Sequence, residues 1–256
     1  DLSAYSSGQG WTPIGKYISP SDNTKAFKGI FNGNGKVISG LYINRSSEHQ
    51  GLFGYIYGGT VINLGLTDVN ISGTGSVGGV AGRVDNSSKI QNSYSTGSVS
   101  GTGDQVGGVA GYANESIIQN CYSHSGVTGR DYVGGVAGGV WDSTVQNCVA
   151  LNSSITLIGS TDNVGRIVGG IINTASLINN YAFSGIPGTW NNKGLAAKDG
   201  ADIAAATLFE QEFWTTTSYW NSDSWNDPGI WTTADNKLPV LAGLAGQSGD
   251  GGLHLL

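Results

Sequence analysis

The chain has 256 residues, of which 43 are glycine, and only 12% are charged, so Ser, Thr, Asn and Gln supply most of its polar surface. With 38% hydrophobic residues, seven Trp and eleven Tyr, it contains enough apolar material for a folded core, which argues against a disordered linker. The net charge of −6 argues against nucleic acid as a partner, and no stretch approaches the roughly 18 apolar residues of a membrane span.

The first 50 residues contain one alternating apolar segment, residues 37–43, which predicts a strand. The chain opens without the basic and apolar regions of an export signal. The period described next begins only after residue 50, so we treat residues 1–50 as a separate segment.

From residue 51 a glycine motif recurs with a nearly constant spacing. Its closing glycines, 54, 82, 111, 138 and 169, follow one another by 28, 29, 27 and 31 residues. Its copies are Gly51-Leu52-Phe53-Gly54, Gly79-Val80-Ala81-Gly82, Gly108-Val109-Ala110-Gly111, Gly135-Val136-Ala137-Gly138 and the degenerate Arg166-Ile167-Val168-Gly169. A second motif, such as Ile118-Gln119-Asn120-Cys121, keeps the same period. Two motifs that share one period predict a repeat architecture.

Each unit is rich in Gly, Ser, Thr and Val, which is the composition of short strands joined by turns. We expect three extended pieces per unit, in the second unit at residues 79–83, 89–94 and 97–100. Stacked units of this kind form an all-β fold, a β-solenoid in which equivalent side chains of neighbouring coils lie about 4.8 Å apart. Two ladders of side chains then follow from the period: Asn63, Asn92, Asn120, Asn147 and Asn179, and Tyr94, Tyr122, Val149 and Tyr181.

The two cysteines, Cys121 and Cys148, stand at equivalent positions of neighbouring coils, flanked in the ladder by Ser93 and Asn180. Parallel-strand neighbours rarely have the geometry of a disulfide, so we expect both to be reduced.

The motif copies resemble a known family, the GLUG repeat, and residues 10–15 and 27–35 resemble the entry segment of such arrays. Together these features cover roughly residues 10–185. The resemblance implies a right-handed parallel β-helix, with about 27–32 residues per coil in this chain. It also implies a secreted or bacterial cell-surface location, since such repeats occur in adhesin-like proteins and in non-catalytic regions of IgA-protease-like proteins. It carries over no catalytic residue.

The period ends near Gly185, which divides the chain into four segments. They are an N-terminal cap with the first coil (1–50), the repeats (51–185), an aromatic-rich C-terminal cap (186–241) and a tail (242–256). Within the cap, residues 201–213 predict a short helix and residues 237–241 a last strand.

The aromatic run of the C-terminal cap includes Tyr219, Trp220 and Trp225 and has two interpretations. It covers the open end of the last coil, which we favour, because an uncovered sheet end invites aggregation. Alternatively, these three residues are exposed ligand contacts that stack on sugar rings.

A row of acids is the most suggestive polar feature. Asp104, Asp131 and Asp162 each lie two residues before the Val that opens a glycine motif, and earlier coils carry Gly75 and Ser47 there. Like charges stacked about 5 Å apart repel one another, which Arg130, solvent, splayed loops or a bound calcium ion would relieve. We favour plain solvated turns, keep calcium as the alternative and expect no other cofactor.

Other chemical motifs give no site. The run Gly73-Thr74-Gly75-Ser76-Val77-Gly78 matches a dinucleotide fingerprint, but its glycines belong to the repeat and no helix is expected after it. The three histidines lack the spacing of metal ligands, and no pattern selects a catalytic triad, so we name no catalytic residue.

We therefore expect a secreted or cell-surface solenoid, an adhesin or stalk module of a larger multidomain protein. It would bind host or matrix glycans or proteins without catalysis, through contacts repeated along the coils. The alternative is a carbohydrate-active enzyme or carbohydrate-binding module on the same scaffold, although the acids follow the repeat rather than converge. A flat hydroxyl face for ice or crystalline polysaccharide is a weaker option, because no Thr-x-Thr ladder is present.

Overall fold

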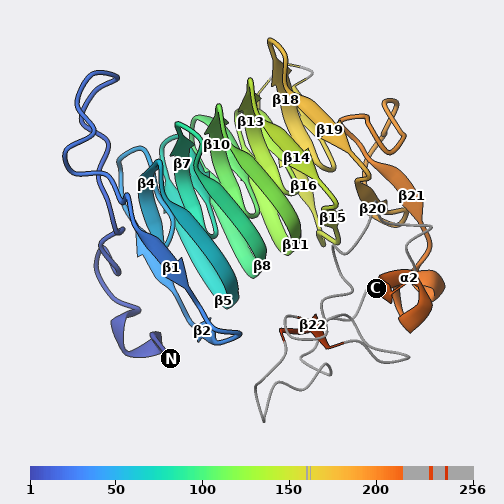
Figure 1. The fold of residues 1–256 in the computed structure, drawn as a ribbon, viewed down its shortest axis with the longest axis horizontal. Coiled ribbons are helices and arrows are strands. Elements are labelled where there is room, and N and C mark those ends of the chain that lie inside the picture. Colours follow the sequence, from blue (N-terminus) through green and yellow to red (C-terminus); the bar gives the residue numbers. More distant parts are fainter. Residues whose placement is uncertain (160, 162, 216–230, 233–239, 242–256) are drawn as a thin grey trace.

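The structure is a computed structural model, and it describes residues 1–159, 161, 163–215, 231–232 and 240–241. Strands dominate it, and stacked coils run from the blue to the orange end of Figure 1. The strands are β1 Ile30–Asn32, β2 Val37–Ser39, β3 Tyr42–Asn44, β4 Phe53–Tyr57, β5 Thr60–Gly73, β6 Val77–Gly78, β7 Ala81–Asp85, β8 Lys89–Gly101, β9 Asp104–Gly107, β10 Ala110–Asn114, β11 Ile117–Gly129, β12 Asp131–Gly134, β13 Ala137–Trp141, β14 Thr144–Gln146, β15 Val149–Ala150, β16 Ile155–Leu157, β17 Val164–Gly165, β18 Val168–Ile172, β19 Ser176–Ile178, β20 Tyr181–Phe183, β21 Ala201–Ile203, β22 Trp231–Thr232 and β23 Val240–Leu241. The helices are the 3-10 turn η1 Ser3–Tyr5, α1 Ala205–Leu208 and α2 Gln211–Thr215.

Three parallel sheets run along the stack. The largest has twelve strands and follows the order β1-β5-β8-β11-β15-β20-β21, the second is β18-β13-β10-β7-β4, and the third is β17-β12-β9-β6. Each strand pairs with its counterpart in the next coil, as in the register Tyr94↔Tyr122 and Ala110↔Ala137. The predicted parallel β-solenoid is confirmed.

One coil passes through the three sheets in turn. The third full coil runs from β9 through the corner at Gly108 into β10, and after a second corner into the long strand β11. The sequence predicted two separate pieces where the structure has one long strand, as in β8. This strand bends where Asn92 and Gly97 have positive φ, at 48° and 116°, and its parallel pairing continues on both sides of each bend.

Both ends differ in detail from the sequence prediction. The strand predicted for residues 37–43 is divided into β2 and β3, because the chain turns at Gly40 with φ 69°. In place of one helix over residues 201–213, β21 extends the large sheet by pairing with β20, and only then do α1 and α2 form. Among the described residues no helix has the length and apolar character that crossing a membrane requires.

The asparagine ladder is confirmed. Its five members all have φ between 48° and 58°, a left-handed conformation that Asn tolerates better than most residues. The side-chain amides hydrogen-bond along the stack: Asn92 Nδ2 donates to Asn63 Oδ1 at 3.1 Å, and Asn120 Nδ2 donates to Asn92 Oδ1 at 3.0 Å. Each Asn therefore bends its own coil through its backbone conformation and bonds to the neighbouring coil through its side-chain amide.

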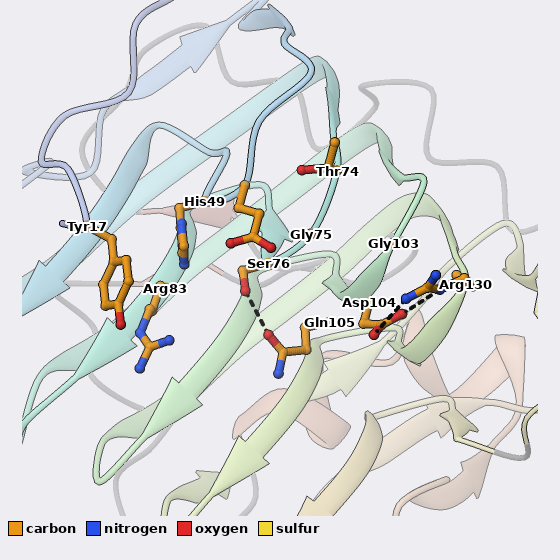
Figure 2. A pocket seen from close by; sticks show the side chains of 11 residues that line it. Tyr17, His49, Thr74, Gly75, Ser76, Arg83, Gly103, Asp104, Gln105 and Arg130 are labelled. Atoms are coloured by element: carbon orange, nitrogen blue, oxygen red, sulfur yellow. Dashed lines mark hydrogen bonds and ion pairs between the residues drawn. The ribbon is translucent and has the colours of Figure 1, made fainter. Parts of the chain in front are cut away.

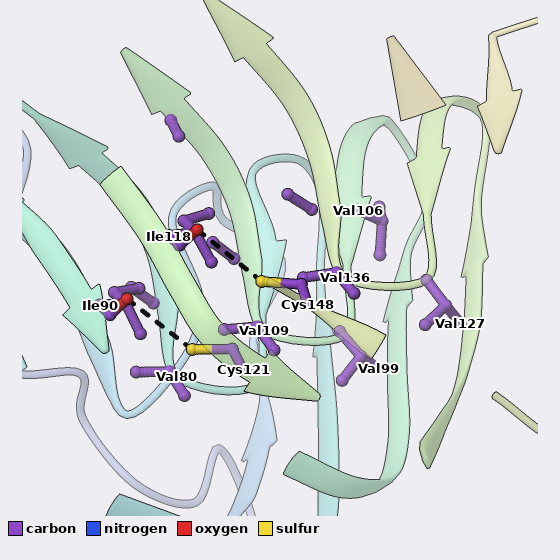
Figure 3. Packing of buried hydrophobic residues seen from close by; sticks show 14 of the residues in the cluster. Val80, Ile90, Val99, Val106, Val109, Ile118, Cys121, Val127, Val136 and Cys148 are labelled. Carbon is purple, nitrogen blue, oxygen red and sulfur yellow. Dashed lines mark hydrogen bonds between the residues drawn. The ribbon is translucent and has the colours of Figure 1, made fainter. Parts of the chain in front are cut away.

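The core between the sheets consists of rows of small apolar side chains. Figure 3 shows Val80, Val109 and Val136 in one such row, and all three are fully buried. Both cysteines are free, as expected, and both are fully buried; the Sγ of Cys121 lies 3.7 Å from the carbonyl oxygen of Ile90. Burial raises the pKa of the Cys121 thiol well above its usual value.

A second apolar cluster lies outside the large sheet. The predicted ladder of Tyr94, Tyr122, Val149 and Tyr181 is confirmed by its register, and the rings of Tyr94 and Tyr122 stack at 4.8 Å. Phe213 of α2 packs edge-on against Tyr181 at 5.3 Å between ring centroids, next to the fully buried Trp214. The described start of the aromatic run therefore packs against the end of this ladder.

The closing glycine of the motif lies where two backbones approach closely. A Cβ added at Gly82, Gly111, Gly138 or Gly169 would come less than 3.0 Å from backbone atoms at the corner of a neighbouring coil. At Gly111 those atoms belong to Ser76 and Val77. None of these four glycines has a positive φ, so the motif requires glycine here for its lack of a side chain and not for its backbone freedom.

Candidate functional site

The corner that leads into the four-stranded sheet carries a second row of residues with left-handed backbone conformation. Gln50, Val77, Val106 and Val133 are register partners, so the residues before them form a row along the stack: His49, Ser76, Gln105 and Tyr132. All four have positive φ, at 61°, 48°, 66° and 51°. Glycine would adopt this conformation at no steric cost, yet the chain places a polar or aromatic side chain at each position. Residues held in such conformations cluster at functional sites.

A groove of about 350 Å³ lies along this row (Figure 2). Four successive coils contribute to it through their corners, and the N-terminal segment and β7 close one end. Its lining side chains are Tyr17, Glu48, His49, Thr74, Ser76, Arg83, Asp104, Gln105 and Arg130, with Gly75 and Gly103 between them. In its middle, the Ser76 hydroxyl and the Gln105 Oε1 form a hydrogen bond of 2.7 Å.

One end of the groove is built around Arg83. Its guanidinium lies between two aromatic rings, 4.6 Å from the centroid of Tyr17 and 4.8 Å from that of Tyr112. Its Nε donates to Asp85 Oδ2 at 2.8 Å, and the Tyr55 hydroxyl donates to the same oxygen at 3.2 Å. Two rings and a carboxylate therefore fix the orientation of this side chain.

Burial controls the protonation of the groups around Arg83. Burial, and to a smaller extent the charge of Arg83, lowers the pKa of His49 to about 4, so this imidazole is neutral at pH 7. Burial raises the pKa of Asp85, although the adjacent Arg83 opposes that shift. Burial and the carboxylate of Asp85 raise the pKa of the Tyr55 hydroxyl. His49 also packs against the ring of Tyr17, at 4.8 Å between centroids.

The other end of the groove carries an ion pair. Arg130 donates from Nε to Asp104 Oδ1 at 2.9 Å and from Nη2 to Asp104 Oδ2 at 3.1 Å. The hydrogen bond and charge of Asp104 raise the pKa of Arg130. At Asp104, Arg130 therefore offsets the repulsion between the stacked acids, which was one of the options predicted from the sequence.

The acidic row itself is partly described. Asp104 and Asp131 are register partners, and Asp131 Oδ1 accepts hydrogen bonds from the Tyr132 N–H and the Thr161 hydroxyl. Asp162 lies outside the described residues. Within the described part of the chain, no group of three or more His, Cys, Asp or Glu is arranged to hold a metal ion. Calcium binding by Asp104, Asp131 and Asp162 stays the alternative to plain solvated turns.

One assignment in this row was wrong by one position. The counterpart of Gly75 in the first coil is Glu48 rather than Ser47, because Gln50 pairs with Val77. The first coil turns the corner with one residue fewer, Gly51-Leu52 in place of Gly78-Gly79-Val80, and counting back from the glycine motif misses this. The correction places a further carboxylate in the row and in the groove.

The sequence prediction did not include the groove. Its proposed ligand contacts, Tyr219, Trp220 and Trp225, lie outside the described residues and stay predictions. The groove residues share no motif, because they occupy the positions of the repeat that change from coil to coil. Aligning the residue that precedes each motif valine would have placed Ser76, Gln105 and Tyr132 in one row.

The repeat also matches a known family. The GLUG motif matches residues 73–100, which include the corner glycines, β7 and most of β8. The chain carries the GLUG motif. Within the matched residues, Gly82 forms the close backbone approach described above, and the corner residue Ser76 lies on the groove.

Two relatives share part of the chain. A protein of Evansella cellulosilytica with the provisional name of a Gly-rich membrane protein is 42% identical over 99 residues, which cover 34% of this chain and 11% of that protein. Halomucin of Haloquadratum walsbyi is 34% identical over 99 residues, 38% of this chain and 1% of halomucin. The alignments thus span about a tenth or less of the length of these relatives.

A solved structure has the same fold. It is the crystal structure of a provisionally assigned immunoglobulin A1 protease from Bacteroides ovatus, with a TM-score of 0.54 and 20% sequence identity. The match covers 83% of this chain and 76% of that chain. At this level of identity the similarity supports the fold and carries no activity over to the chain.

Proposed function

We propose that the GLUG solenoid is a cell-surface adhesion module that presents the groove at its coil corners to glycans or proteins and binds them without turnover. The observation that carries the proposal is the groove itself. Four successive coils supply its residues, and the stacked sheets hold each corner at a fixed place. Sites built on rigid elements are better defined than sites on isolated loops.

Two further observations support a surface location. One of the two relatives bears the name of a Gly-rich membrane protein and the other that of halomucin, and both are far longer than the aligned region. The chain has few charges and many Ser, Thr and Asn side chains on its turns, which suits an extended polar rod. In such a rod, the stacked coils act as the stalk and the corners as the contact surface.

The proposal is tested by binding and product analysis of the purified chain. We expect saturable binding on an array of glycans and matrix proteins, and unchanged polysaccharide lengths after prolonged incubation. Shortened polysaccharide products would contradict the proposal and indicate an enzyme. Absence of binding to every glycan and protein would leave a passive stalk. Antibody labelling of intact cells of the source organism tests the location, and labelling only after lysis would contradict it.

A further inference from the structure

The groove side chains have a common chemistry that points to one class of ligand. Gln105, Glu48 and His49 present planar amide, carboxylate and imidazole groups, and Ser76 adds a hydroxyl. The amide and the carboxylate each carry two polar atoms on one carbon and so match pairs of neighbouring hydroxyl groups, which each donate and accept a hydrogen bond. We propose that the groove binds an uncharged saccharide chain that lies parallel to the solenoid axis; this inference rests on the adhesion function proposed above.

The charge balance of the groove favours an uncharged ligand over an acidic one. Both guanidinium groups are already paired, Arg83 with Asp85 at 2.8 Å and Arg130 with Asp104 at 2.9 Å. Glu48 adds a further carboxylate, and His49 is neutral at pH 7 because burial lowers its pKa to about 4. A uronate or a sulfated sugar would therefore meet no surplus positive charge and would be repelled by Glu48.

The spacing of the coils also fits a chain of sugars. The row from His49 to Arg130 crosses three coil intervals, about 14 Å at roughly 4.8 Å per coil. A pyranose ring in an extended chain is comparable in length to one coil interval. Consecutive sugar units therefore meet equivalent corner positions, first His49, then Ser76, then Gln105.

The middle of the groove has free hydrogen-bonding capacity. Gln105 Oε1 bonds to the Ser76 hydroxyl, but within the described residues the Gln105 amide nitrogen has no hydrogen-bond partner. The carboxylate of Glu48, one coil before Ser76, is exposed and likewise has no hydrogen bond to the described residues. One saccharide hydroxyl can accept from this amide, and another, one or two coils away, can donate to the carboxylate.

The positive φ values allow side-chain removal without strain. We design the double variant Ser76→Gly/Gln105→Gly, because glycine adopts the φ values of 48° and 66° at these positions without steric cost. The matched control is Ser87→Gly/Asn173→Gly. These two exposed residues also have positive φ, 59° and 56°, and lie outside the groove.

The experiment compares the wild-type chain and both variants on an array of neutral, uronate-containing and sulfated oligosaccharides, followed by calorimetric titration of the tightest ligand. We expect the wild type to prefer neutral oligosaccharides of two or more units, the groove variant to bind them about tenfold more weakly or worse, and the control to match the wild type. Circular dichroism melts of all three chains establish that the variants are folded.

The alternative outcomes separate this inference from the adhesion function. Neutral saccharide binding that both variants retain, or a preference for acidic saccharides, would overturn the groove assignment while leaving an adhesion module. Binding to proteins alone would do the same. Absence of binding to every saccharide and matrix protein would overturn both proposals.

Discussion

The closing glycine of the repeated motif provides the sharpest test of how the coils stack. In Gly111→Ala, the new Cβ would lie less than 3.0 Å from the Val77 nitrogen, the Ser76 carbonyl carbon and the Gly82 oxygen. All three are backbone atoms inside paired strands or at the corner, so none can move aside as a flexible side chain would. The substitution therefore either separates two coils locally or strains the corner that holds Ser76.

The expected magnitude follows from overpacking. Inserting a methyl group into a closely packed site costs about 1–3 kcal/mol, and Gly111→Ala belongs near the upper end because its three nearest neighbours are backbone. Gly126→Ala is the matched control within the same coil. There the nearest atom to the new Cβ is the Ser154 hydroxyl at 3.3 Å and φ is not positive, so we expect a change between neutral and about 1 kcal/mol of stabilisation.

Thermal and urea melts followed by circular dichroism measure the difference. We expect Gly111→Ala to lower the melting temperature by roughly 2–4 °C for each kcal/mol lost, and Gly126→Ala to leave it unchanged or higher. Equal stability of the two variants would refute the close-approach explanation of the motif. A loss at Gly126 alone would refute it as well.

Four further predictions follow from other features. Arg166→Ala removes a buried guanidinium that donates to three backbone carbonyls, so we expect it to lower the free energy of unfolding by about 3 kcal/mol. Proteolysis near residues 183–202 should also become faster. An unchanged melting temperature would contradict this prediction. Burial lowers the pKa of His49 from 6.5 to about 4, so on acidification His49 is protonated in the unfolded chain before it is protonated in the folded chain. The free energy of unfolding therefore falls by up to about 3 kcal/mol as the pH drops from 6.5 to about 4. Urea melts of His49→Gln, compared with wild type across that interval, should lack this loss, and identical pH profiles would rule out the effect. Asn120→Ala should be less stable than Asn120→Gly by about 1 kcal/mol in urea melts, because both lose the amide ladder but only Ala is strained at φ 53°; the reverse order would exclude this role of the backbone. A thiol reagent should label Cys121 and Cys148 only in denaturant, and fast labelling of the native chain would show that the core opens.

Most of the fold could be predicted because stacking translates sequence period directly into neighbours in space. The Asn and Tyr ladders needed only the spacing of two motifs, and the structure pairs them as expected. The predictions that failed depended on local bends. The turn at Gly40 divides one predicted strand into two. Residues 201–203 form strand β21 of the large sheet, although the Ala-rich composition predicted a helix there. There, edge pairing with β20 outweighs helix propensity.

The candidate site was harder to predict because its chemistry lies in residues that the repeat leaves free to vary. Ser76 and Gln105 are different residue types that no sequence motif links, and Tyr17 and Arg83 come from other segments of the chain. The acidic row was recognised, but its first member was placed at Ser47 instead of Glu48 because one coil is shorter at its corner. Period alone cannot reveal a single-residue deletion within a turn. The hydrogen-bond register can.

Arg166 occupies the motif position that glycine holds at residues 79, 108 and 135, and this single exchange has a consequence for the length of the array. Its guanidinium donates hydrogen bonds to the carbonyls of Phe183, Asp199 and Gly200. The backbone ladder also continues there: the Val136 N–H donates to the Ile167 carbonyl, and the Ile167 N–H donates to the Lys198 carbonyl. Arg166 thus anchors the segment that follows the last glycine motif. Duplication of a coil within the gene, upstream of the Arg166 codon, would add one corner to the described solenoid while leaving the contacts of Arg166 unchanged.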